Sequence, residues 1–316
     1  MNKPYFLAIV GPTATGKSSL AIQIAQRIRS AIISMDSLQI YKGLNIGTAK
    51  PSEDELKAVK HEMIDIVSPF ENYSVSEYIT KTKELIFKYN SENTLPILTG
   101  GTALYLKSLI SNYTFSNTSE NNEYREYLQS IAKDEQGKKA LLEMLYKVDP
   151  KSASKLHYNN TRRVIRALEI YKKDGIPMSE QKDFNEAIYD YCLIGLNKDR
   201  KHLYEDINNR VDTMIDNGLI SEVKGLLNNG LNQNNQAMQG IGYKELIDYF
   251  NGNISLNESI DKIKQNSRRY AKRQITFFNS FKSINWLYTD KINDILSEAL
   301  QIINNSNIKD KIYYDK

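Results

Sequence analysis

One short segment constrains this chain more than any other: an eight-residue run that fits the pattern GxxxxGK[ST]. It lies between an apolar stretch and a helical pattern and reads Gly11-Pro12-Thr13-Ala14-Thr15-Gly16-Lys17-Ser18. In this pattern, backbone N–H groups and the N-terminus of the following helix surround phosphate oxygens, the lysine contacts the phosphates and the serine ligates Mg²⁺. The segment therefore predicts a phosphate-binding loop with Lys17 and Ser18 in those roles. The alternative is a glycine-rich turn that carries a surface lysine.

The first third of the chain alternates short β-rich runs with helical patterns, as parallel α/β sheets do. We expect strands at residues 6–10, 31–35, 63–67 and 96–99, and helices at residues 17–29, 74–89 and 102–110. Such sheets bind ligands at the carboxyl ends of their strands, so Gly11, Asp36 and Gly100 should converge on one crevice. The predicted fold class is α/β, with a P-loop NTPase-like parallel sheet core flanked by helices.

After residue 114 the pattern becomes mostly helical. Helical patterns at residues 124–131, 138–146 and 162–172 precede strand character at 189–196, and further helices are expected at 204–217, 221–229, 244–250 and 256–281. At about 150 residues per domain, the 316 residues correspond to roughly two domains. We expect a core in two parts, residues 1–114 and 186–290, interrupted by a helical insertion domain at residues 115–185 and followed by a helix and tail at residues 291–316.

Composition excludes several classes of protein. Apolar residues make up 41% of the chain and charged residues 25%, which is ordinary for a globular protein and excludes bulk disorder. No apolar run approaches membrane-spanning length, and the run at residues 5–10 is too short for a signal peptide. Cys192 is the single cysteine and the three histidines lack ligand spacing, so no disulfide or zinc site is expected. We expect a cytoplasmic protein with no membrane partner and no structural metal.

The phosphate-binding loop alone does not identify the ligand. Residues 197–200 read Asn-Lys-Asp-Arg and lack the last aspartate of the guanine-specific NKxD pattern, which disfavours a guanine-nucleotide switch. Asp36, at the end of an expected strand, could hold Mg²⁺ through water or accept a proton from a nucleophile beside the phosphates. Its alternative role is to cap the turn at Ser37. The net charge of +4 leaves partners undecided, because affinity for nucleic acid then depends on a local basic surface.

Six segments, in this order, resemble the tRNA dimethylallyltransferase family. They are Gly11 to Ser18, DSLQIYKGLNIGTAKP at residues 36–51, GGTALY at 100–105, RVIRALE at 163–169, GIGYK at 240–244 and YAKRQ at 270–274. The resemblance spans roughly residues 5–288, and the run at 36–51 is far more specific than the phosphate-binding loop. Adenylate isopentenyltransferases share the loop and the strand-end aspartate but are not expected to carry the whole set. The zinc finger of eukaryotic members has no counterpart, so the chain resembles the bacterial type.

The resemblance implies transfer of a dimethylallyl group from dimethylallyl diphosphate to N6 of the adenosine immediately 3′ of the anticodon, in tRNAs that read codons beginning with U. The phosphate-binding loop then serves the prenyl donor, with Mg²⁺ as cofactor and Arg210 near the diphosphate. An allylic diphosphate ionises once its leaving group is neutralised, which the loop amides, Lys17 and Mg²⁺ bound to Ser18 can do. An exocyclic adenine amine is a poor nucleophile, so Asp36 is the candidate base. The resemblance places Thr102 beside the reacting centre or the target nucleotide; capping the following helix is its alternative role.

Two segments of the core resemble the family's tRNA contacts. The first comprises Asp36, Ser37, Leu38 and Gln39, with Thr102 beside it, and the second comprises Gln239, Gly240, Ile241, Gly242, Tyr243 and Lys244. The Gln39 amide suits a base edge. Tyr243 suits stacking on a base and Lys244 suits a phosphate, although an ordinary loop and helix start would account for the same residues. Many relatives begin the second segment with arginine where this chain has Gln239.

In the insertion, the resemblance implies tRNA contacts for Arg125, Arg162, Arg163, Val164, Ile165 and Arg166. Arg162 and Arg166 are one helical turn apart, so the arginines of this helix suit RNA phosphates or the diphosphate; a solvated basic face is the alternative. For Arg210, pairing with Asp206 is the alternative to the diphosphate. A second basic run at residues 268–273 is either an RNA-facing stripe or a solvated face, and no catalytic role is assigned to it.

The target adenosine is stacked inside an anticodon loop, so we expect it to be flipped into a channel while the insertion grips the anticodon stem. We expect a monomer. Two other function classes stay open: a Mg²⁺-dependent small-molecule kinase that binds ATP in the same loop, and an RNA-binding protein with a vestigial loop. The run at residues 36–51 disfavours the kinase, and the intact Lys17, Ser18 and Asp36 disfavour the vestigial loop.

Overall fold

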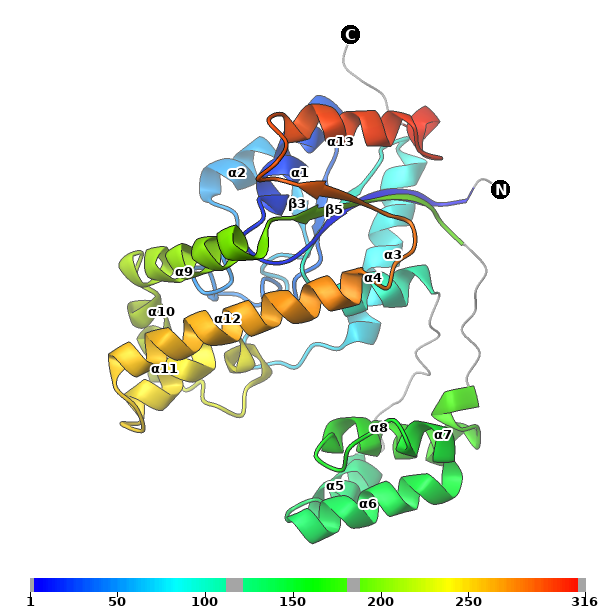
Figure 1. Cartoon of the computed structure of the whole chain (residues 1–316), viewed down its shortest axis with the longest axis vertical. Helices are drawn as coiled ribbons and strands as arrows, with labels where there is room; N and C mark the ends of the chain where they lie inside the picture. The colour runs from blue at the N-terminus through cyan, green and yellow to red at the C-terminus, as the bar shows by residue number, and fades with distance from the viewer. Residues whose placement is uncertain (1–2, 112–121, 181–187, 312–316) are drawn as a thin grey trace. The chain divides into compact units, whose positions relative to one another are not determined.

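The computed structural model describes residues 3–111, 122–180 and 188–311 of the chain. The chain divides into two compact units, of which the first comprises Met1–Ile110 and Ala187–Lys316 and the second comprises Ser111–Glu186. The first unit holds the sheet, whereas the second is helical (Figure 1).

A six-stranded parallel sheet forms the centre of the first unit. Its strands are β1 (Tyr5–Val10), β2 (Ile32–Ser34), β3 (His61–Glu62), β4 (Ile97–Gly100), β5 (Asp190–Asn197) and β6 (Ile284–Tyr288). They lie in the order β3-β2-β4-β1-β5-β6, and each pairing is parallel. The α/β fold class predicted from the sequence is confirmed.

The strands end together at the edge where the phosphate-binding loop begins. Val10 of β1 lies opposite Gly100 of β4 and opposite Gly195 of β5. Ser34, the last residue of β2, lies opposite Thr99. The loops that follow β1, β2 and β4 therefore start at one level of the sheet, which is where parallel sheets bind their ligands.

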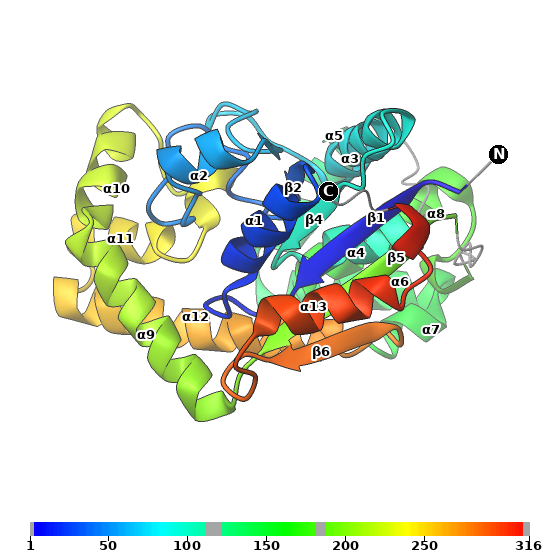
Figure 2. The same ribbon diagram turned by 90° about the horizontal axis from the view of Figure 1, so that it is seen from above.

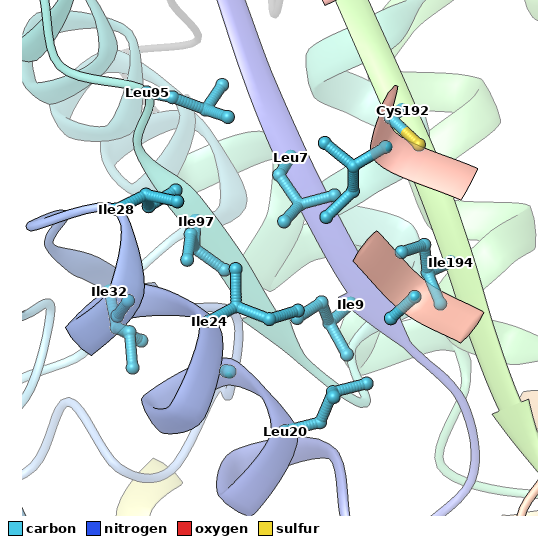
Figure 3. Close-up of a cluster of buried hydrophobic side chains, with 14 of the residues drawn as sticks. Leu7, Ile9, Leu20, Ile24, Ile28, Ile32, Leu95, Ile97, Cys192 and Ile194 are labelled. Carbon is cyan, nitrogen blue, oxygen red and sulfur yellow. The ribbon is translucent and has the colours of Figure 1, made fainter. Parts of the chain in front are cut away.

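Helices cover both faces of this sheet. On one face, Leu20 and Ile24 of α1 (Lys17–Arg27) pack against Leu7 and Ile9 of β1 and Ile97 of β4 (Figure 3). Helix α13 (Ile295–Asn304) adds to the same cluster, and the 3₁₀ turn η3 (Lys309–Lys311) follows it. Helices α3 (Val75–Ser91) and α4 (Ala103–Ile110) pack on each other and lie on the opposite face (Figure 2). The alternating residues of the strands thus face two separate apolar layers.

A group of helices at the carboxyl edge has an apolar core of its own. The group comprises α9 (Arg200–Asp216), α10 (Leu219–Asn228), α11 (Tyr243–Phe250) and α12 (Leu256–Phe278), with the 3₁₀ turn η2 (Gln236–Gln239) (Figure 1). Its core also contains Ile40, Tyr41 and Leu44 from the loop after β2. The loop that follows Asp36 is therefore held by helices from the second half of the chain. The short helix α2 (Glu53–Ala58) comes after this loop and begins with a capping box formed by Ser52 and Glu55.

The second unit comprises α5 (Asn122–Ile131), α6 (Glu135–Val148), α7 (Pro150–Ala153), α8 (Thr161–Asp174) and the turn η1 (Met178–Glu180). Leu128, Leu141, Leu145, Val164 and Leu168 lie in its apolar core. The unit is therefore helical, as expected, and buries its own apolar side chains. No helix within the described ranges is both long and apolar enough to cross a membrane.

The structure corrects the expected strand at residues 63–67. The third strand in the chain is instead β3, and Met63 and Asp65 have φ values of 66° and 54°, which an extended strand cannot include. Val67 forms a parallel bridge with Tyr41. Strand β6 and helix α2 were not among the expected elements, and α12 ends at Phe278 instead of residue 281.

Candidate functional site

A cavity of about 470 Å³ opens at the carboxyl edge of the sheet. The phosphate-binding loop contributes Thr13, Lys17 and Ser18 to its wall, and the loop after β2 contributes Asp36. Further lining residues are Ser37, Leu38, Gln39, Gly100, Gly101, Arg210, Gln239, Gly240, Ile241, Gly242, Lys244, Tyr270, Arg273 and Gln274. The structure thus brings together, in one cavity, residues from both ends of the first unit.

The phosphate-binding loop has the tight backbone that anion binding requires. Gly11 has a φ of 139°, and a Cβ there would lie 2.2 Å from the carbonyl oxygen of Leu196 in β5, so only glycine fits. The buried Thr15 hydroxyl donates to the carbonyl of Pro12 at 2.9 Å. Helix α1 starts directly after Gly16 with no side-chain cap, which leaves its first N–H groups for a ligand.

Lys17 is a cation in a site that disfavours its charge. Its Nζ donates to the carbonyl of Pro12 at 2.5 Å. Burial, together with the nearby Arg210 guanidinium, lowers the pKa of Lys17 to about 7, and Asp36 opposes the shift. Burial also lowers the pKa of Arg210, again opposed by Asp36. Two cations close together in a partly dry cavity favour a multiply charged anion as ligand.

The position of Arg210 distinguishes between its two predicted roles, binding of the diphosphate and pairing with Asp206. Arg210 lines the cavity, whereas Asp206 forms an ion pair with Lys198. No Arg210–Asp206 pair occurs among the ion pairs of the described residues. The geometry therefore favours the diphosphate over helix-surface pairing for Arg210.

Asp36 caps the turn after β2, as one of the predicted roles requires, and its side chain also reaches the cavity; its part in Mg²⁺ binding or proton transfer stays a prediction. Its Oδ1 accepts the backbone N–H of Leu38 at 2.8 Å and that of Gln39 at 3.3 Å, so the carboxylate caps the turn after β2. The same side chain forms part of the cavity wall. Because the turn engages Oδ1, the carboxylate is fixed in position, and Oδ2 is the oxygen that the turn does not use.

The backbone of Thr102 contacts the segment that carries Asp36. Its N–H donates to the carbonyl of Met35 at 3.1 Å, which joins the turn after β4 to the end of β2. The Thr102 hydroxyl is buried beside the Tyr270 side chain and does not cap α4. Thr102 itself is not part of the cavity wall, although its neighbours Gly100 and Gly101 are.

Gln39 does not have the role expected of it. Its Oε1 accepts the Ser34 hydroxyl at 2.8 Å, and its Nε2 donates to the carbonyls of Thr48 and Ala49 at 3.2 and 3.1 Å. The amide is thus engaged in holding the loop closed, and the expectation that it reads a base edge is wrong. Ser37 and Leu38 do lie in the cavity wall.

The expectation for Tyr243 is also wrong. The side chain is fully buried and its hydroxyl donates to Glu222 at 2.7 Å, so the ring cannot stack on a base. Burial and the neighbouring Glu222 raise the pKa of Tyr243. The five other residues of its segment, Gln239, Gly240, Ile241, Gly242 and Lys244, line the cavity.

Glu222 is a residue that sequence reasoning missed. Besides Tyr243, its carboxylate accepts the backbone N–H groups of Asn45 and Ile46 at 2.9 and 2.8 Å and that of Gly47 at 3.2 Å. One side chain of α10 thereby holds the loop after β2 and the start of α11. Its sequence position, on an exposed helical pattern, gave no signal of this role.

Gln274 was also missed, although a signal was present. It is buried in α12 and lines the cavity, and it falls on the helix row of Ile263, Ala271 and Phe278, which are also buried. A polar residue at an apolar position of a helical pattern indicates a buried hydrogen-bonding role. Tyr270, one turn earlier, is also in the wall. Burial raises the pKa of Tyr270 to about 12, and the Thr102 and Gln274 side chains beside it oppose the rise.

The basic run of α12 is divided between several contacts. Arg268 donates to the Asn208 side chain at 2.5 Å, and Lys264 pairs with Asp212 at 2.6 Å, so these two cations join α12 to α9. Arg273 lines the cavity. Within the run at residues 268–273, Arg268 therefore contacts α9 and Arg273 lines the cavity, so the run is not a wholly solvated face.

In the insertion, the predicted residues separate into exposed and buried groups. Arg162 and Arg163 are exposed on α8, whereas Val164 and Ile165 are buried in the core of the unit. The expectation of tRNA contact through the Val164 and Ile165 side chains is therefore wrong. Arg125 forms two hydrogen bonds to Glu169, at 2.7 and 3.0 Å, and Arg166 lies 3.9 Å from the same carboxylate.

The donors for a cation are few. Within the described residues, no cluster of three or more His, Cys, Asp and Glu side chains is suited to a metal. The cavity does contain the Ser18 hydroxyl and the Asp36 carboxylate. Mg²⁺ prefers hard oxygen donors and keeps several waters, so these two side chains fit Mg²⁺ that also binds phosphate oxygens.

Comparison with known proteins gives consistent results. The model of the IPP transferase family matches residues 39–281. The chain is 46% identical over 287 residues to the tRNA dimethylallyltransferase of Caldanaerobacter subterraneus, covering 89% of this chain and 91% of the relative. It is 48% identical over 282 residues to the tRNA dimethylallyltransferase of Geobacillus thermodenitrificans, covering 89% of each.

Solved structures agree with these relatives. The full-length tRNA isopentenylpyrophosphate transferase of Bacillus halodurans is similar, with a TM-score of 0.72 and 40% identity over 98% of this chain and 97% of that one. A eukaryotic dimethylallyltransferase acting on tRNA is similar with a TM-score of 0.81 and 27% identity, covering 99% of this chain and 81% of that one.

Proposed function

The chain belongs to the IPP transferase family, and we propose on this basis that it is a tRNA dimethylallyltransferase. The donor is dimethylallyl diphosphate and the acceptor is N6 of the adenosine immediately 3′ of the anticodon, in tRNAs that read codons beginning with U. One observation carries the proposal: a single cavity has both a phosphate-binding loop and a fixed carboxylate in its wall. The first suits the leaving group and the second suits the nucleophile.

At the donor end, the N–H groups at the start of α1 hold the diphosphate, and Lys17 and Arg210 add positive charge. These charges stabilise the diphosphate most strongly as the allylic C–O bond breaks, because the diphosphate then takes up the electron pair of that bond. Ser18 would hold Mg²⁺, with Asp36 as an outer ligand through water; the ion supplies further positive charge for the leaving diphosphate.

At the acceptor end, N6 of adenine forms a bond to C1 of the prenyl group as the C1–O bond breaks. The amine then carries an extra proton, and Asp36 accepts it through Oδ2 while Oδ1 stays bound to the turn. Thr102 lies beside Tyr270 of the cavity wall and is bonded through its N–H to Met35, the residue before Asp36, so we assign it to the acceptor end as well. Both residues act on the nucleophile, whereas Lys17 acts on the leaving group.

The tRNA must present its adenosine outside the base stack, because the reacting atoms lie in a cavity. Ser37, Leu38 and the 239–242 segment line this cavity and suit backbone contact with the extruded nucleotide, and Lys244 suits a neighbouring phosphate. We assign the grip on the anticodon stem to the insertion, through the exposed Arg162 and Arg163.

The direct test is transfer of label. The purified protein is incubated with Mg²⁺, dimethylallyl diphosphate labelled in the prenyl group and unmodified tRNA, and the tRNA is then digested to nucleosides. We expect label on N6 of the adenosine next to the anticodon. Unlabelled tRNA combined with ATP-dependent phosphorylation of a small acceptor would instead identify a kinase. Tight tRNA binding without transfer would identify an RNA-binding protein.

A further inference from the structure

A buried amide of α12 joins the two halves of the cavity wall. Gln274 is 5% exposed. Its Oε1 accepts the backbone N–H of Thr13 at 3.1 Å, and its Nε2 donates to the carbonyl of Gly101 at 2.9 Å. Both ends of the amide are therefore engaged with backbone, and each backbone group belongs to a different loop.

The two loops have different tasks in the proposed reaction. Thr13 belongs to the phosphate-binding loop, which holds the donor. Gly101 belongs to the turn after β4, which is bonded through the N–H of Thr102 to the carbonyl of Met35, the residue before Asp36. Gln274 thus connects the segment that holds the leaving group to the segment that carries Thr102 and Asp36.

The fit around this amide is close. A Cβ at position 101 would lie 2.1 Å from Nε2 of Gln274, closer than any real contact. The turn after β4 therefore needs glycine at this position because the amide occupies the space of a side chain. A side chain held this tightly, with both ends bonded, allows little change in the separation of the two loops.

We propose that Gln274 is a positioning residue for prenyl transfer: by bonding to Thr13 and Gly101 it sets the separation between the donor diphosphate and the groups that receive the adenine. This inference rests on the proposed function. Gln274 acts through the two backbone groups and takes no proton or leaving group itself. A misplacement of about 1 Å between reacting groups can cost about 100-fold in rate, so the expected effect is on turnover.

The first test is Gln274→Met, which keeps the size of the side chain and removes both hydrogen bonds. We expect kcat for label transfer to fall about 10- to 100-fold while KM for dimethylallyl diphosphate changes less than about threefold. The matched control is Gln265→Met, an exposed residue of the same helix that does not line the cavity, which should leave both constants unchanged. A kcat within twofold of the wild type, or an effect confined to the donor KM, would overturn the proposal.

A second test separates positioning from packing. Gly101→Ala alone should lower Tm, because its Cβ meets the Gln274 amide. Combining it with Gln274→Ala removes that clash, so the added alanine should cost the double variant no Tm beyond that of Gln274→Ala alone. We expect kcat of the double variant to stay as low as that of Gln274→Ala; a kcat near that of the wild type in either variant would mean that Gln274 serves packing only, and the proposal would fall. A wild-type protein that transfers no label would refute the proposed function itself, whereas an active wild type with active Gln274 variants would refute this inference alone.

Discussion

At the scale of single residues, Asp36 offers a clean substitution because its two carboxylate oxygens have different surroundings. Asparagine keeps an oxygen that can accept the N–H groups of Leu38 and Gln39 but cannot take a proton from N6. We expect Asp36→Asn to leave Tm and donor affinity nearly unchanged and to lower kcat about 10²- to 10⁴-fold. Single-turnover transfer and calorimetric binding of the donor measure the two effects. Turnover within threefold of the wild type would show that another group accepts the proton.

Lys17 makes donor binding depend on pH. Its pKa is lowered to about 7 in the free protein, so the ammonium form, which the diphosphate needs, is depleted above that pH. Donor affinity should therefore fall as pH rises from 7 to 9, by up to about tenfold per unit, with proton uptake on binding. Calorimetry in buffers of different ionisation enthalpy measures both quantities. Lys17→Met should bind the donor weakly and without this pH dependence; an equal slope in both proteins would contradict the assignment.

The same pKa shift has a consequence for the unliganded fold. The unfolded chain holds the Lys17 proton up to its ordinary pKa of 10.5, whereas the folded chain releases it near 7. Between these values the unfolded state binds more protons, so this residue makes folding more favourable as pH rises. Relative to Lys17→Met, the wild type should gain stability across that window in urea titrations.

The sequence predicted the residues of the phosphate-binding loop and Asp36 because their roles depend on local backbone. Lys17 stands at the end of the loop, where helix α1 begins. Asp36 follows β2, and the register of β2 with β4 fixes where that strand ends along the sheet edge. Gln39 and Tyr243 were assigned wrongly because the sequence cannot show which polar side chains are consumed by internal hydrogen bonds. Gln274 was missed since its partners lie 173 and 261 residues away along the chain.

At the scale of elements, Glu222 of α10 ties the loop after β2 to the first residue of α11. Tyr243→Phe removes one bond to this carboxylate and keeps the buried ring. We expect a loss of about 1.5–3 kcal/mol of unfolding free energy, the range for hydrogen bonds to charged groups. Urea denaturation measures it, with Tyr249→Phe in the same helix as the control. A stability loss near zero together with a large rise in the tRNA KM would contradict the purely structural role.

Elements were predictable where apolar periodicity was long. The strands β1, β4 and β5 and the helices α3, α8 and α12 lie within a few residues of their expected bounds. The third strand was predicted a few residues too late, because Met63 and Asp65 have left-handed backbone conformations. An apolar run in the sequence does not indicate such conformations. Strand β6 is short and half-exposed, and it forms because β5 offers it a parallel edge from residue Leu193 to Asn197.

At the scale of the whole molecule, the division into two units permits separation of donor binding from tRNA binding. The second unit, Ser111–Glu186, has its own apolar core, and the sheet and cavity belong entirely to the first. Replacing residues 111–186 by a flexible linker should therefore preserve diphosphate binding and abolish tRNA binding. Calorimetry and filter binding measure the two. Retained affinity for an anticodon stem-loop would show that the insertion does not provide the grip.

A milder variant tests the same assignment without removing the unit. Arg162→Glu with Arg163→Glu changes two exposed charges of α8. We expect tRNA affinity to fall and its dependence on salt to weaken by about 0.7–0.9 per lost phosphate contact on a double-logarithmic plot. Lys133→Glu with Lys151→Glu, also exposed in this unit, is the matched control. Equal losses in the two variants would indicate a general charge effect instead of a specific contact.

Because β1 lies between β4 and β5, the centre of the sheet cannot close until late in the synthesis of the chain. β4 ends at Gly100 and β5 begins at Asp190, so roughly 90 residues must be translated in between, which takes about 5–20 s at about 5–20 residues per second. The helical insertion is translated in that interval, and with its own core it can fold without waiting for the sheet. The nascent chain meanwhile exposes the edge of β1, whose residues are all buried in the finished sheet, and such an unpaired apolar edge is prone to aggregation.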